Sequence, residues 1–133
     1  MRVDISDKMI EKELEGAGYD VGRAEESLHG GDYKWASVQA YYSMFHAAKA
    51  LVLKKGYREK SHYCLLVALK ELYVKANELE QEFVDNFEMV MDTRHEADYA
   101  LIYDKESAEI AIENAKVFVH KTQGLLKNKR DKK

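Results

Sequence analysis

Residues 33–55 read YKWASVQAYYSMFHAAKALVLKK, the most apolar stretch of the chain. Its large apolar side chains recur at the spacing of one helix face, namely Val38, Tyr41, Tyr42, Phe45, Ala48, Val52 and Leu53. The opposite arc is mostly small, namely Ala36, Gln39, Ser43, Ala47 and Ala50. A helix that is apolar on one side and small on the other is expected to pack against neighbours on both sides. The stretch therefore predicts the central helix of a helical domain, and one neighbour could be a second copy of the chain.

Four further helices are predicted around this central one. Hydrophobic residues keep a helical period over about residues 4–28, from about residue 61, over 79–97 and from 104 to 126. Gly30, Gly31 and Asp32 supply a helix stop and a cap, and Ser61 and Asp104 are good N-cap residues. We predict an all-α antiparallel bundle of about five helices, forming one domain over residues 1–126, with a basic tail over residues 127–133.

The composition fits a soluble helical protein. Of the 133 residues, 46% are hydrophobic and 34% are charged, and there is no proline. No apolar run approaches the ~20 residues that cross a bilayer, and the N-terminus lacks a signal-peptide core, so we expect a cytoplasmic protein with no membrane contact. The five histidines show no paired ligand spacing, so we expect no metal, and no motif indicates a cofactor.

Charge is spread unevenly along the chain. The last seven residues carry five basic side chains and one aspartate, a net +4, which leaves −7 for residues 1–126 of the total of −3. An acidic body is a poor surface for general nucleic-acid binding. The tail could contact RNA or an acidic partner, but a frayed, solvated helix end is the favoured interpretation.

Arg94 and Asp98 are the most unusual residues of the predicted fourth helix. They continue an apolar stripe made of Leu79, Phe83, Phe87, Val90 and Met91. A buried charge costs several kcal/mol unless it is paired and hydrogen-bonded. Three interpretations stay open: a structural Arg94–Asp98 ion pair, an anion or nucleotide-phosphate site at Arg94, and a nuclease centre formed by Arg94 with His95.

Further candidate ligand-binding residues are His46, Lys49 and Tyr99. Lys49 lies within the apolar face of the central helix and His46 lies at its edge, so either could meet Asp98 or a bound anion. The favoured alternative is structural, with Lys49 extending along the surface and His46 hydrogen-bonded at the core edge. Tyr99, like Tyr103, could stack on a base near Arg94.

Three glycines interrupt the predicted first helix. Gly16, Gly18 and Gly22 each weaken a helix interior by about 1 kcal/mol relative to alanine. They indicate either a local break or a place where another helix packs very close, and we favour close packing.

Two segments resemble signatures of a known family. The string GDYKWASVQAYYSMFHAAKAL, residues 31–51, resembles the second helix of HEPN domains. The string RHEADY, residues 94–99, followed by an alanine-rich last helix, resembles the next signature of that family. With the helix order, the resemblance extends over about residues 7–126.

The resemblance implies a helical bundle that dimerises through its helices. In prokaryotes such proteins often act beside a small nucleotidyltransferase in a toxin–antitoxin-type pair. Some members are metal-independent ribonucleases, whereas others bind nucleotides or hold partners. The nuclease signature is an arginine followed, after four to six residues, by a histidine near the fourth helix.

This chain departs from the nuclease signature. The residues at the spaced positions after Arg94 are Tyr99, Ala100 and Leu101, and His95 is about 100° around the helix from Arg94. Arg58 and His62 are one residue closer than the signature requires. We therefore favour a homodimeric, non-catalytic HEPN domain that binds a nucleotide or a nucleotidyltransferase partner. The alternatives are a metal-independent ribonuclease using Arg94 and His95, and a helical interaction scaffold without a ligand.

Overall fold

The computed structural model describes residues 6–59, 61–100 and 104–131, although the side chains of residues 93, 95–100 and 128–131 are not described. These ranges form five α-helices and one π-helical turn, with no strand among them: α1 (Asp7–His29), α2 (Tyr33–Lys54), α3 (His62–Leu69), η1 (Lys70–Val74), α4 (Gln81–Ala100) and α5 (Lys105–Asp131). The predicted all-α bundle of about five helices is confirmed.

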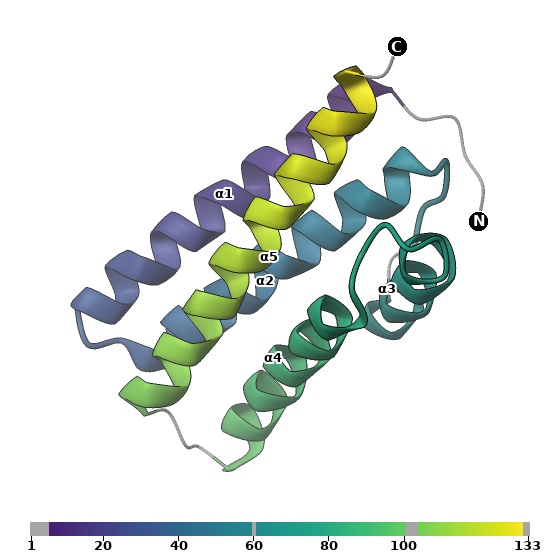
Figure 1. The fold of residues 1–133 in the computed structure, drawn as a ribbon. Coiled ribbons are helices and arrows are strands. Elements are labelled where there is room, and N and C mark those ends of the chain that lie inside the picture. The colour runs from purple at the N-terminus through teal and green to yellow at the C-terminus, as the bar shows by residue number, and fades with distance from the viewer. Residues whose placement is uncertain (1–5, 60, 101–103, 132–133) are drawn as a thin grey trace.

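Helix α2 lies at the centre of the bundle. It contacts α1 and α5, which run alongside it, and also α3 and α4, which lie on its other side (Figure 1). Twelve of its residues are buried: Ala36, Ser37, Ala40, Tyr41, Ser43, Met44, Ala47, Ala48, Ala50, Leu51, Val52 and Leu53. The prediction that this helix packs on both sides is confirmed, and the neighbours on both sides belong to the same chain.

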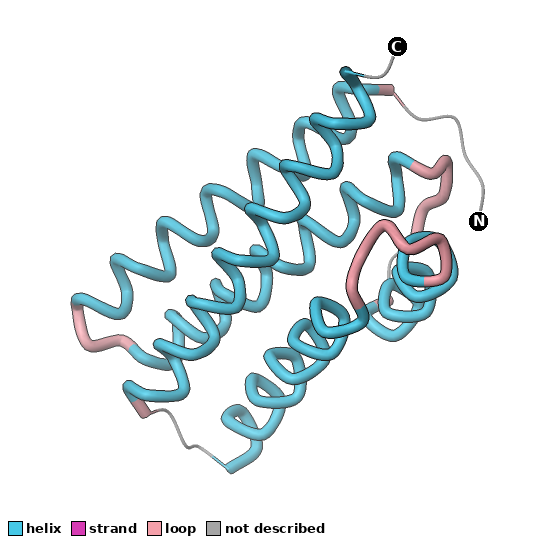
Figure 2. The backbone as a smooth tube through the Cα atoms, viewed as in Figure 1, coloured by secondary structure: helices cyan, strands magenta, loops and turns pink. Residues whose placement is uncertain are grey.

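Short loops join the helices (Figure 2), and side-chain caps define where the helices begin. The Asp32 carboxylate accepts a hydrogen bond from the Trp35 backbone N–H at 3.2 Å, and the Ser61 hydroxyl accepts one from Cys64 N–H at 3.0 Å. Asp104 accepts a third from Ser107 N–H at 2.7 Å. All three predicted caps are confirmed. Each contributes about 1 kcal/mol to the stability of its helix.

The three glycines of α1 have different surroundings. A Cβ at Gly16 would lie 3.4 Å from Cγ of the His46 ring, so the predicted close packing is confirmed there. At Gly18 and Gly22 a Cβ would meet no described atom within 4 Å. The expectation of close packing is wrong at these two positions, because they lie on the exposed face of an unbroken helix.

None of the described helices is long and apolar enough to span a membrane.

Candidate functional site

Arg94 lies between α4 and α2, over two tyrosine rings. Its guanidinium carbon is 5.3 Å from the centroid of the Tyr41 ring and 5.5 Å from that of Tyr42. Cation–π contacts of this kind contribute about 0.5–2 kcal/mol each, more when they are shielded from water. The aromatic face of α2 thus stabilises the inward charge of Arg94, whose side chain stays partly exposed.

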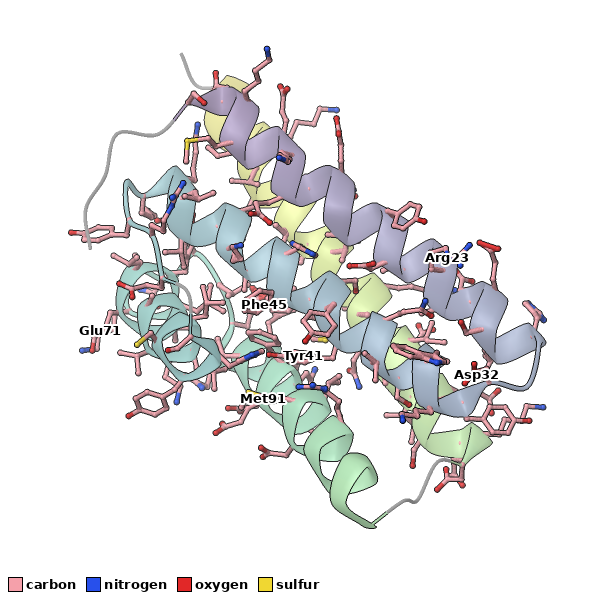
Figure 3. All side chains as sticks on the ribbon, turned by 180° about the vertical axis from the view of Figure 1, so that it is seen from behind. Arg23, Asp32, Tyr41, Phe45, Glu71 and Met91 are labelled. Carbon is pink, nitrogen blue, oxygen red and sulfur yellow. The ribbon has the colours of Figure 1, made fainter. Side chains whose placement is uncertain are left out.

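The rings below Arg94 form a packed cluster. Tyr41 is fully buried, and its ring stacks on Phe87 of α4, with centroids 5.9 Å apart, and on His62 of α3, with centroids 5.1 Å apart. Phe45 lies 4.9 Å from the His62 ring. Figure 3 shows Tyr41 and Phe45 on α2 directed toward α4, near Met91. Three helices therefore contribute to one cluster.

We name Tyr41, Tyr42, Phe45, His62 and Arg94 the arginine–aromatic site. The Tyr41 hydroxyl and the His62 Nδ1 atom are buried, and neither has a hydrogen-bond partner among the described residues. Buried polar atoms without a partner are rare in folded proteins and call for an explanation.

The environment of His62 favours its neutral form. Its burial, and then the positive charge of Arg94, hold the pKa of the imidazole below its ordinary value. The Ser61 cap fixes His62 at the first position of α3, which presents its ring to Tyr41. The site therefore combines a permanent cation, a neutral imidazole and a phenol.

Two of the predicted ligand-binding residues, His46 and Lys49, contact the Phe45 ring of this site but make their ion pairs with α1. His46 bonds through Nδ1 to the Glu13 carboxylate at 2.7 Å, and its Nε2 lies 3.5 Å from the Asp20 carboxylate. Lys49 Nζ is 3.1 Å from Glu13. These contacts tie α1 to α2 and agree with the structural interpretation of His46 as a hydrogen-bonded residue at the core edge.

The pKa values of the two carboxylates in this α1–α2 cluster are shifted in opposite directions. Burial raises the pKa of Glu13, but hydrogen bonds from His46 and Lys49 outweigh this effect, so the pKa lies below its ordinary value. Burial also raises the pKa of Asp20, and the charge of His46 offsets this only in part, so that pKa lies above its ordinary value. Of the two carboxylates, Glu13 is thus the one whose charged form His46 and Lys49 stabilise more strongly.

The side chains of the remaining predicted site residues are not described. The backbones of His95, Asp98 and Tyr99 are in α4, but their side chains are not described, and neither is Tyr103. The Arg94–Asp98 ion pair stays a prediction.

Sequence reasoning did not assign Tyr41 or His62 to the site. Tyr41 was placed on an apolar helix face, and His62 was considered only for its spacing from Arg58. The available signal was the combination of two adjacent tyrosines on the central helix with an inward-facing arginine. Which rings that arginine would meet depends on how α2 and α4 pack, and hydrophobic periodicity does not specify this.

The fold and this site define an all-helical bundle with an arginine held on the aromatic face of its central helix. The sequence matches the HEPN domain over residues 10–125, and the chain belongs to the HEPN domain family. The predicted resemblance is confirmed.

Several relatives share most of the chain. "Putative toxin MJ0142" of Methanocaldococcus jannaschii is 31% identical over 97% of this chain and 92% of its own length. A UPF0332 protein of Archaeoglobus fulgidus is 31% identical over 80% of this chain and 86% of its own length. The crystal structure of TT1696 from Thermus thermophilus has the same fold, with a TM-score of 0.75 at 24% identity, over 87% of this chain and 97% of that one.

Proposed function

We propose that this protein is the toxin-type HEPN component of a two-component system and binds a nucleotide phosphate through Arg94. The names of its relatives support the toxin assignment. The observation that carries the binding proposal is the position of the Arg94 guanidinium over the rings of Tyr41 and Tyr42. The proposal includes a homodimer and a nucleotidyltransferase partner, as the family resemblance implies.

The contact with the rings suits Arg94 to phosphate recognition. A guanidinium presents its N–H groups along its edge, in a fork that matches two phosphate oxygens, while its faces can rest on aromatic rings. Tyr42 is only partly buried, so its ring is available to a base. Stacking of a base on an aromatic side chain contributes about 1–3 kcal/mol and does not require a particular base.

Calorimetry with AMP tests this function. We expect Arg94→Ala to fold and to lose at least about tenfold in affinity, because a charge-assisted hydrogen bond contributes roughly 1.5–3 kcal/mol. Arg23→Ala is the matched control, since Arg23 lies on α1 in an exposed pair with Glu26. If Arg94→Ala binds AMP as the wild type does, the proposal is wrong. If Arg94→Ala does not fold, Arg94→Lys, which keeps the charge but loses the fork, replaces it.

Ribonuclease activity is the second candidate, and one observation favours it. His62 is neutral and close enough to Arg94 for the arginine charge to lower its pKa. An imidazole that can accept a proton beside a cation that stabilises phosphate charge is a combination found in metal-independent RNA cleavage. Cleavage of RNA by pure protein in EDTA, lost in both Arg94→Ala and His62→Ala, would establish it. The same assay on His95→Ala tests the histidine adjacent to Arg94.

A further inference from the structure

Two buried polar atoms of the arginine–aromatic site are not explained by the packing of the bundle. The Tyr41 side chain has no exposed surface, and its hydroxyl has no hydrogen-bond partner in the described part of the chain. The same holds for Nδ1 of His62, whose ring stacks on that of Tyr41. Water satisfies both groups in the unfolded chain, so burying them unpaired opposes folding.

Another tyrosine shows how the fold satisfies a buried phenol when its role is structural. Tyr73 in η1 is also fully buried, and its hydroxyl donates a hydrogen bond to the backbone carbonyl of Leu51 in α2. Tyr41 has comparable burial without such a bond. Among the described residues, the Tyr41 hydroxyl therefore has hydrogen-bonding capacity that the packing does not use.

We propose that the Tyr41 hydroxyl and the His62 Nδ1 atom are ligand-binding groups, which together with Arg94 bind the phosphate of a nucleotide. All three groups can donate hydrogen bonds: the guanidinium always, the phenol through its O–H, and the imidazole when Nδ1 carries the proton. Three donors beside a permanent cation match the several acceptor oxygens of a phosphate better than the mixed donors and acceptors of a base edge.

Arg94 is the side chain that gives a ligand access to these atoms. It is long and partly exposed, and it lies over the Tyr41 ring, whereas Tyr41 and Phe87 are packed in the core. In the proposed complex the Arg94 side chain turns about its own bonds, and the phosphate lies between the guanidinium, the Tyr41 hydroxyl and the His62 Nδ1 atom.

The test compares two conservative variants, Tyr41→Phe and Tyr73→Phe, by thermal melting and by AMP calorimetry. We expect Tyr41→Phe to keep or raise the melting temperature, since an unpaired buried hydroxyl is removed, and to weaken AMP binding about tenfold. Tyr73→Phe should do the reverse, with a lower melting temperature and unchanged binding. His62→Phe keeps the stacked ring but loses both nitrogens, so it should also weaken binding. His62→Asn, which places a polar atom near the position of Nδ1, should bind AMP more tightly than His62→Phe does.

The inference rests on the proposed function, and the two can fail separately. If Tyr41→Phe and His62→Phe bind AMP like the wild type while Arg94→Ala does not, the two inner groups are not ligand contacts and the proposed function stands. If Tyr41→Phe is destabilised as much as Tyr73→Phe, the hydroxyl is structural and the inference is overturned. Adenosine and inorganic phosphate serve as further probes, and equal binding of adenosine and AMP would overturn the phosphate assignment. A wild type that binds neither AMP nor a short oligoadenylate overturns both.

Discussion

Tyr73 links the π-helical turn to the central helix through one side chain. Its hydroxyl bonds to the Leu51 carbonyl, and the Lys55 amine lies 4.8 Å from the centroid of its ring. Burial, and then the charge of Glu78, raise the pKa of the phenol well above its ordinary value, so the hydroxyl keeps its proton at neutral pH. A single buried phenol thus connects two elements.

We predict that Tyr73→Phe lowers the free energy of unfolding by about 1 kcal/mol, the usual net value of one buried hydrogen bond. Urea denaturation followed by circular dichroism measures it. Tyr19→Phe is the control, because the Tyr19 side chain is exposed, and it should leave the midpoint unchanged. Equal midpoints for Tyr73→Phe and the wild type would contradict the structural role.

His62 makes the stability of the molecule depend on pH. Its pKa is lowered in the folded state, so between the ordinary value and the folded value the unfolded chain binds more protons than the folded chain. Stability from this group is therefore complete above the ordinary histidine pKa and falls as pH falls toward the folded value. We predict that lowering the pH from 7.5 to about 5.5 decreases the melting temperature of the wild type more than that of His62→Gln. A parallel decline in the two proteins would show that His62 does not contribute.

At the scale of one element, α1 carries helix-weakening glycines whose substitution should give different results. Gly18 and Gly22 have open space where a Cβ would be placed, whereas Gly16 lies against the His46 ring. An exposed interior glycine costs a helix about 1 kcal/mol relative to alanine.

We predict that Gly18→Ala raises the free energy of unfolding by about 0.5–1 kcal/mol, because nothing opposes the gain in helix propensity. Gly16→Ala should gain less, since its new methyl group would lie only 3.4 Å from the imidazole that bonds to Glu13, at the lower limit of ordinary van der Waals contact. Chemical denaturation of both variants measures the difference. If Gly16→Ala stabilises as much as Gly18→Ala does, the contact with His46 is not tight.

At the scale of the whole molecule, we propose that the folded domain ends at Leu126. Leu126 is buried near the end of α5, whereas Lys127 is exposed. Removal of residues 127–133 deletes a net charge of +4 but no described core residue. We predict that the chain without residues 127–133 unfolds cooperatively. Its free energy of unfolding should lie within about 0.5 kcal/mol of that of the full chain, the usual range for changes at the surface. A decrease in the free energy of unfolding several times larger than this would show that residues of the tail contribute to the folded domain.

The sequence predicts the helices well and the site only in part. Helical periodicity and the caps at Asp32, Ser61 and Asp104 are local properties, so the five α-helices and three of their starts could be predicted, whereas the π-helical turn η1 was not. The inward position of Arg94 is also local, because it follows from one stripe. Its partners are not, because Tyr41 and His62 approach Arg94 only through the packing of three helices. The partners of His46 and Lys49 could not be predicted for the same reason. Their carboxylate partners lie on α1, and no local sequence pattern indicates this pairing.

The two carboxylates that hold His46 also determine how α1 can lie along α2. Glu13 is hydrogen-bonded to Nδ1 of the His46 imidazole and Asp20 lies 3.5 Å from its Nε2, and Gly16 between them leaves room for the ring. Sliding α1 by one helical turn would bring Lys12 or Asp20 to the place of Gly16 and would separate His46 from Glu13. The contacts around one imidazole therefore favour the observed register of the α1–α2 hairpin over its neighbours.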